Sequence, residues 1–117
     1  MRPSCEIVSR YVLPVFRSMV ARMMMMKYDL SQSEVASKLG VTQAAVSHYM
    51  KSKRGAKMAS ELEKMPEVKA AVIRISERLM QNGNGEEIVF EEFCGLCKTI
   101  RRNAAFWEKI DEILANR

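Results

Sequence analysis

The sequence predicts an all-α protein, and three observations carry this prediction. Apolar residues recur at the three- and four-residue spacing of amphipathic helices through most of the 117-residue chain. No segment alternates between apolar and polar residues as a strand does, because the one candidate, residues 88–90, is too short. Hydrophobic residues make up 48% of the chain, which is enough to build a core and too many for a disordered protein.

The first predicted helix covers the stretch before Lys27, where apolar residues recur from Ile7 to Met23. Pro14 lies inside this run. Because proline lacks an N–H group and clashes with the preceding turn, it should kink the helix or split it into two pieces. The methionines at 23–26 could form an adaptable interaction surface. We favour the simpler interpretation that some of them face the core and the others are tolerated on the surface.

Further helices are predicted towards the C-terminus. One short helix, 57–65, should stop at Pro66, which can also serve as the first residue of the next helix. The Asn-Gly-Asn-Gly run at 82–85 predicts a turn and is the clearest linker. Apolar residues from Ile88 to Ile100 follow this turn. The last helix carries the apolar residues Phe106, Trp107, Ile110, Ile113 and Leu114. All of these except Ile113 are candidates for a dimer contact, although we favour core packing for them.

The charge of the chain is unevenly distributed. The net charge is +5, and the sequence pI is about 9.3. Residues 1–65 hold 11 Lys or Arg against 5 Asp or Glu, whereas residues 66–117 hold 8 against 9. The basic excess therefore belongs to the N-terminal half, which favours contact with nucleic acid there.

Nothing in the sequence indicates a membrane segment. No apolar run reaches 18 residues, and Arg10, Arg17 and Arg22 interrupt the N-terminal stretch, which no small-residue cleavage site follows. Three cysteines, two of them three residues apart, do not form the framework of a secreted disulfide-rich domain. We therefore expect a cytoplasmic protein with no membrane partner.

A pair of short helices is predicted between residues 31 and 51. Ser31 and Glu34 have the spacing of a capping box, so one helix should start at Ser31. It should end at Gly40, which adopts a left-handed conformation without steric cost. Thr42 should cap the second helix. Two short helices joined at a glycine must cross steeply, and Ala36 leaves room for them to touch.

This pattern resembles the helix-turn-helix of the Cro and phage-repressor (XRE-type) family. The matching residues are Gln32-x-x-Val35-Ala36-x-x-Leu39-Gly40-Val41-Thr42-Gln43-x-x-Val46-Ser47. The resemblance implies a lambda-repressor-like bundle with additional C-terminal helices. It implies a non-enzymatic transcription regulator that binds double-stranded DNA, by default as a homodimer on a two-fold operator. Residues 1–65 would be the DNA-binding domain and residues 66–117 a helical region for dimerisation or sensing.

The geometry of such a helix assigns candidate DNA contacts. Outward residues near the N-terminus of the second helix reach base edges in the major groove. By position these are Thr42, Gln43, Ala44, Ser47 and His48. Gln43 can pair with adenine through two hydrogen bonds, and Ala44 can offer only a methyl contact. The candidate phosphate contacts are Lys51, Lys53 and Arg54, with Gln32 and Lys38 as weaker candidates.

Cys94 and Cys97 form a Cys-x-x-Cys pair with three possible roles. The two thiols could be buried in a helical core, or they could form a reversible disulfide. Alternatively they could bind zinc or an iron–sulfur cluster, with Cys5 as a third ligand. A Cys-x-x-Cys oxidoreductase would need βαβ surroundings that the sequence lacks.

The N-terminal Arg-Pro-Ser-Cys segment, the helix-turn-helix and the late Cys-x-x-Cys together resemble a group of predicted archaeal transcription regulators. Two alternatives to a DNA-binding regulator remain. One is a protein–protein adaptor or antitoxin-like module with the same fold. The other is a thiol or iron–sulfur redox sensor without direct DNA readout.

Overall fold

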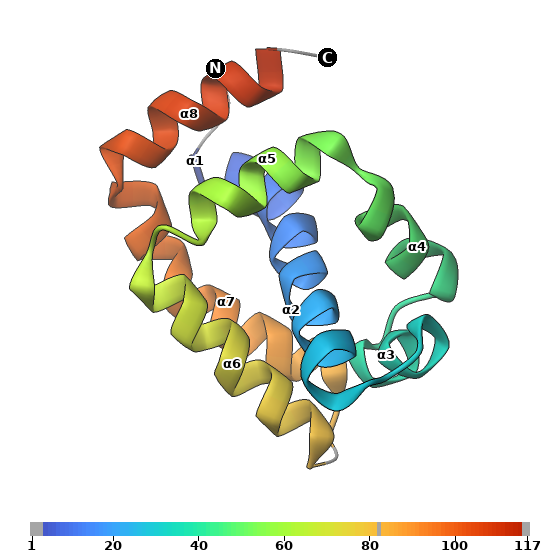
Figure 1. Ribbon diagram of the computed structural model, residues 1–117. Helices are drawn as coiled ribbons and strands as arrows, with labels where there is room; N and C mark the ends of the chain where they lie inside the picture. The colour runs from blue at the N-terminus through green and yellow to red at the C-terminus, as the bar shows by residue number, and fades with distance from the viewer. Residues whose placement is uncertain (1–3, 82, 116–117) are drawn as a thin grey trace.

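The computed structural model describes residues 4–81 and 83–115, and within them every regular element is helical. The predicted all-α fold is therefore confirmed (Figure 1). The elements are α1 (Ser4–Ile7), η1 (Val8–Val12), α2 (Leu13–Tyr28), α3 (Gln32–Leu39), α4 (Gln43–Lys51), α5 (Lys53–Leu62), α6 (Pro66–Met80), α7 (Gly85–Arg102) and α8 (Ala104–Ala115). Within the described ranges no helix is both long enough and apolar enough to cross a membrane.

The first helical stretch changes type at the proline. Residues 8–12 form a π-helix, in which the Leu13 N–H group donates to the Val8 carbonyl five residues earlier. Pro14 then occupies the first turn of α2, where its missing N–H group costs least. The interruption predicted at Pro14 is thus a wider helical turn that leads directly into α2.

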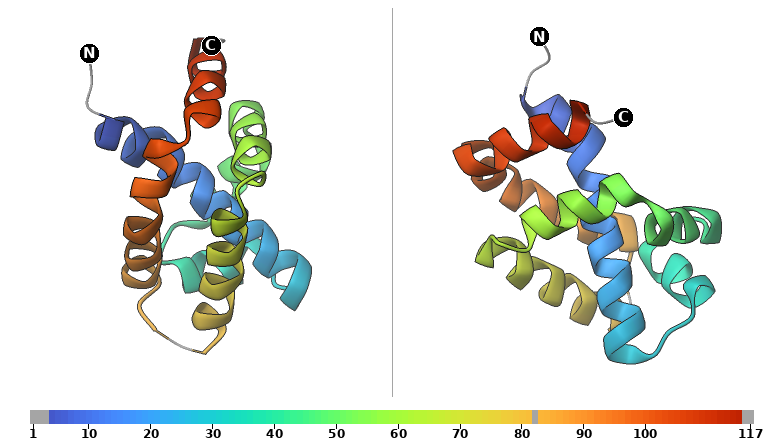
Figure 2. Two further views of the ribbon diagram at one scale, coloured as in Figure 1. Left: turned by 90° about the vertical axis from the view of Figure 1, so that its left-hand side faces the viewer. Right: turned by 45° about the horizontal axis from the view of Figure 1, so that its top comes forward.

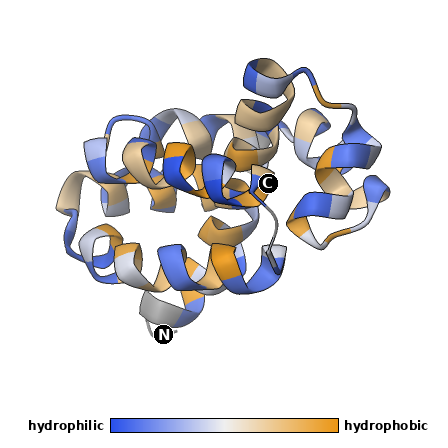
Figure 3. Ribbon diagram, turned by 90° about the horizontal axis from the view of Figure 1, so that it is seen from below, coloured by the Kyte–Doolittle hydropathy of each residue, from blue (hydrophilic) through white to orange (hydrophobic). Residues whose placement is uncertain are grey.

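The helix α2 lies at the centre of the molecule. It contacts α3, α4 and α5 as well as α6, and Figure 1 shows α3 and α4 on one side of it and α6 and α7 on the other. The side chains of Val12, Phe16, Val20 and Met24, each four residues from the next, are fully buried. The Phe16 ring packs at 5.4 Å, centroid to centroid, against Phe93 of α7. The core therefore follows one stripe that runs from η1 along α2. Figure 3 shows hydrophobic and hydrophilic residues within the same helices.

The helix α5 starts earlier than predicted. The sequence predicted a helix beginning at residue 57, but α5 begins at Lys53. The Ser52 hydroxyl caps it, because Ser52 Oγ accepts a hydrogen bond from the Gly55 N–H group at 3.0 Å. Lys53 is therefore fixed in the first turn of a helix. The predicted start of α6 at Pro66 is confirmed.

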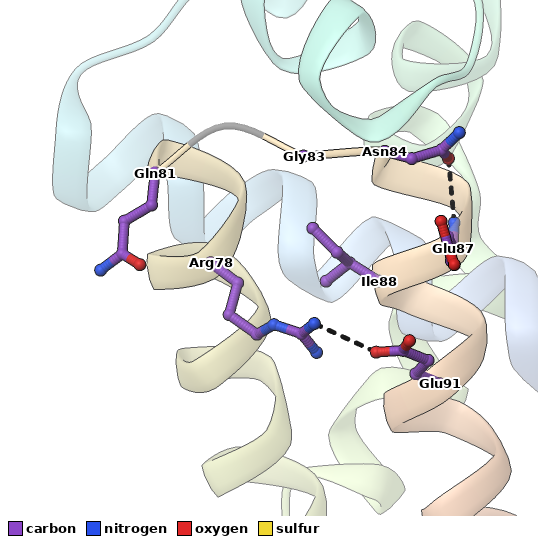
Figure 4. A pocket seen from close by; sticks show the side chains of 7 residues that line it. All are labelled: Arg78, Gln81, Gly83, Asn84, Glu87, Ile88 and Glu91. Atoms are coloured by element: carbon purple, nitrogen blue, oxygen red, sulfur yellow. Dashed lines mark hydrogen bonds and ion pairs between the residues drawn. The ribbon is translucent and has the colours of Figure 1, made fainter.

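The helices α6 and α7 pack side by side and are joined by the predicted turn, of which Asn82 lies outside the described residues. Asn84 Oδ1 caps α7 by accepting from the Glu87 N–H group at 3.1 Å. Figure 4 shows Arg78 of α6 reaching across to Glu91 of α7, and the ion pair between them measures 3.0 Å. Exposed pairs of this kind contribute at most about 1 kcal/mol each, so the buried apolar faces hold the two helices together.

The last helix, α8, packs against α5 and α7 of the same chain (Figure 2). Its side chains Phe106, Ile110 and Ile113 are buried within the chain. Trp107 is partly buried, and its indole N–H group donates to the Arg101 carbonyl at 2.6 Å. Of the two roles predicted for this apolar stripe, packing in the core is the one that the structure displays.

Candidate nucleic-acid interface

The start of α3 has the predicted capping box. Ser31 Oγ accepts from the Glu34 N–H group at 3.1 Å, and Glu34 Oε1 accepts from the Ser31 N–H group at 3.0 Å. The backbone and hydroxyl groups of Ser31 lower the pKa of Glu34, because these hydrogen bonds favour the ionised carboxylate. The beginning of the first helix of the pair is thus defined by two residues that lie three positions apart.

The turn between α3 and α4 also follows the prediction. Gly40 has a φ of 76°, which favours glycine, and its N–H group donates to the Ala36 carbonyl at 3.0 Å. The Val41 N–H group donates to the same carbonyl at 3.1 Å. Thr42 Oγ1 then accepts from the Ala45 N–H group at 3.0 Å and caps α4. The turn therefore begins and ends at fixed residues.

One face of the helix pair is buried. Val35, Ala36 and Leu39 of α3 and Val46 of α4 belong to the core. Ala36 is buried in α3, and α3 and α4 contact each other as the sequence indicated. Tyr49 and Met50 of α4 are only partly buried. The burial of Val46 determines which side of α4 remains available to a partner.

The predicted base contacts lie at the N-terminal end of α4 and are mostly exposed. Thr42, Gln43, Ala44 and His48 are exposed, and Ser47 is half-buried. These side chains come from the cap, the first turn and the second turn of α4. An outward first turn of this kind is what a recognition helix presents to base edges.

The predicted phosphate contacts lie on three helices. Lys51 at the end of α4 and Lys53 at the start of α5 are exposed. Gln32 and Lys38 of α3 are half-buried. The side chain of Arg54 lies outside the described residues, so its role stays a prediction. Lys51 and Lys53 flank the Ser52 cap and add positive charge beside the outward face of α4.

The sequence did not predict the role of Arg22. This residue belongs to α2, and its Nη2 donates to the Met50 carbonyl at 3.2 Å. It thereby provides a partner for one of the last carbonyl groups of α4, which no intrahelical N–H group reaches. The two residues are 28 positions apart, so no local spacing pattern could have indicated this contact.

A second unpredicted support lies behind the turn. Gly85, the first residue of α7, lies so close to the end of α3 that an added Cβ atom would collide with the Lys38 carbonyl oxygen. The same atom would lie 2.8 Å from the Leu39 oxygen. The neighbouring Glu86 packs against Gly40. The α3–α4 turn is therefore braced by the N-terminus of α7.

The cysteines are only partly described. Cys94 is exposed and Cys97 is half-buried, and both are free thiols. The interpretation as two core thiols is therefore wrong for Cys94. Cys5 belongs to α1, which contacts α7, but its side chain lies outside the described residues. Among the side chains that are described, no group of three His, Cys, Asp or Glu could hold a metal ion. The three-cysteine site stays a prediction.

Two short helices joined at a left-handed glycine, with a buried Val46 and an outward first turn, define a DNA-binding helix-turn-helix of the lambda-repressor type. Residues 21–69 match the family model described as Helix-turn-helix, and this segment is a helix-turn-helix of the XRE type. The match extends from α2 into α6 and includes all of α3, α4 and α5. The chain matched no curated protein and no solved structure.

Proposed function

We propose that the protein is a sequence-specific transcription regulator that reads the major groove with α4. The exposed first turn of α4, on a helix that Val46 anchors in the core, is the observation that supports this proposal most directly. In the proposed complex Gln43 reads adenine and Ala44 contacts a thymine methyl group, while Thr42, Ser47 and His48 add polar contacts. The protein would act in the cytoplasm, by occupying promoter DNA.

We assign phosphate binding to Lys51 and Lys53, with Arg54 and the two α3 residues Gln32 and Lys38 as further contacts. Ammonium and guanidinium groups that neutralise phosphates release counterions, so affinity should fall steeply with salt. We further propose that two copies bind a two-fold operator with half-sites one helical turn apart. Residues 66–117 would then serve dimerisation or sensing, in addition to bracing the turn.

The test starts with selection of a preferred duplex from a random-sequence library by the full-length protein. Gln43→Ala should cost about 1–3 kcal/mol on that duplex and little on random DNA. Lys53→Ala should weaken binding to both and reduce the slope of log affinity against log salt by about 1. Lys98→Ala in α7 removes the same charge far along the chain from α4 and is the matched control.

The alternatives predict different results. An adaptor or antitoxin-like module would enrich no duplex and would show no salt-dependent DNA affinity. A redox sensor without DNA readout would behave in the same way and would respond only to thiol oxidation. Sedimentation of the protein with the selected duplex gives the number of copies bound, and a single copy would refute the homodimer.

A further inference from the structure

A groove of about 570 Å³ opens between α2, α5 and α6. Its volume falls within the roughly 300–1,000 Å³ that small-molecule sites occupy. Its lining is mainly apolar and includes Met23 and Met26 of α2 and Val72 and Ile73 of α6. Three large hydrophobic side chains are exposed in the described part of the chain, and Met26, at 85%, and Ile73, at 40%, are two of them. Water-exposed apolar surface is therefore concentrated at this groove, which suits an apolar ligand.

The polar residues at the groove are mostly cationic. Arg22, Lys27 and Lys69 line it, against the single carboxylate of Glu63. Lys27 pairs with Glu77 at 3.8 Å. No carboxylate in the described ranges lies within ion-pair distance of Arg22 or Lys69. An apolar wall with a surplus of cations favours a ligand with a hydrocarbon tail and an anionic head group.

One of these cations also belongs to the DNA-binding unit. The Arg22 guanidinium lines the groove and donates through Nη2 to the Met50 carbonyl at the end of α4. A guanidinium binds a carboxylate best through two parallel hydrogen bonds, and each of its two edges that can make them includes Nη2, the atom that donates to Met50. A carboxylate in the groove would therefore compete with the Met50 carbonyl for the same side chain.

We propose that the groove binds a medium-chain alkyl carboxylate, and that this ligand weakens DNA binding by withdrawing Arg22 from α4. The proposed binding of the ligand depends only on the groove, whereas the proposed effect on DNA rests on the function proposed above. Ligand and DNA then favour opposite positions of one guanidinium, so each must lower the affinity of the other by the same factor. The loss of one hydrogen bond to a charged donor at the surface corresponds to about a fivefold change.

Binding is tested first without DNA, with decanoate as the probe and methionine methyl groups as the NMR signals. Decanoate should shift the methyl signals of Met19, Met23 and Met26 and leave Met80, outside the groove lining, unmoved. Decyltrimethylammonium, with the same tail and the opposite charge, should bind much more weakly. Met26→Asp should lower the affinity for decanoate about tenfold. The fold should not change, because the Met26 side chain is almost fully exposed. Lys69→Met should also lower the affinity for decanoate, and Lys98→Met should leave it unchanged.

The effect on DNA is tested next, with the selected duplex. Saturating decanoate should lower the DNA affinity of the wild-type protein about fivefold, and saturating DNA should lower decanoate affinity equally. Arg22→Met should abolish this coupling. Lys69→Met should need a higher decanoate concentration for saturation, but at saturation it should show the same fall in DNA affinity as the wild type. The reason is that Lys69 contributes to binding the head group and not to the contact with α4.

Each failure has a separate meaning. A protein that binds DNA but shows no methionine shifts with decanoate would overturn the inference and leave the proposed function standing. A protein that binds decanoate but no DNA would refute the proposed function and the coupling with it. A dimer that Met26→Asp converts to monomers, together with no decanoate binding, would show that a second copy covers the groove. Unchanged or increased DNA affinity with decanoate would refute the competition for Arg22.

Discussion

The contact between α7 and the α3–α4 turn leads to a quantitative prediction for Gly85→Ala. A Cβ atom at this position would lie 2.7 Å from the carbonyl carbon of Leu39 and 2.8 Å from its oxygen, and it would collide with the Lys38 oxygen. All three atoms belong to the backbone, so no side-chain rotation can relieve the overlap and α7 must move away from α3. Overpacking of this kind costs typically about 1–3 kcal/mol. We expect the upper end of that range, which corresponds to a fall of roughly 10 °C in Tm for a chain of this size.

The same helix provides the control. Gly95 is also a helical residue of α7, but a Cβ atom there would meet nothing within 4 Å. Gly95→Ala should therefore stabilise the protein by about 0.5–1 kcal/mol, because alanine loses less backbone entropy in a helix. Urea unfolding of the two variants and the wild type measures both free energies. Equal stability of Gly85→Ala and the wild type would refute the close approach of α7 to α3.

Three further predictions concern the helix-turn-helix. Thr42→Ala should destabilise the protein by about 1 kcal/mol in urea unfolding, because the Ala45 N–H group loses its cap, whereas Thr42→Ser should restore most of this. The pKa of Glu34 is lowered in the folded state, so its contribution to stability is complete above the ordinary value of 4.5 and is lost as the pH falls through the lower folded-state pKa. Glu34→Gln should remove that component from an acid titration of stability, and an unchanged acid profile would contradict the capping geometry. Arg22→Met should lower DNA affinity in a filter-binding or anisotropy assay about fivefold even without any ligand, since the Met50 carbonyl loses its charged donor.

The helix boundaries of the DNA-binding unit were predictable because they depend on neighbouring residues. The hydrogen bonds of Ser31 with Glu34 and of Thr42 with Ala45 span three positions, and Gly40 needs its conformation whatever the rest of the chain does. The exposed side of α4 was predictable for a related reason. Once Val46 faces the core, the helical period turns Ala44 and His48 away from it, and Gln43 is exposed because it is the first residue of α4.

The start of α5 was predicted four residues too late. The basic residues and the glycine after Ser52 carry no apolar periodicity of their own. What makes them helical is the Ser52 cap together with the burial of Met58 and Leu62 further along the same helix. Packing at one end of α5 therefore extends the helix back to Lys53.

The sequence by itself determined the all-α class, the capped helix pair and the residues that α4 can present to DNA, because these depend on hydrogen bonds and periodicities within a few positions. Only the tertiary structure decided how that pair is supported. Arg22 of α2 donates a hydrogen bond to α4, Gly85 allows α7 to approach the end of α3 closely, and α8 packs against α5. Such contacts join residues tens of positions apart, and they depend on where whole helices lie, which no local pattern encodes.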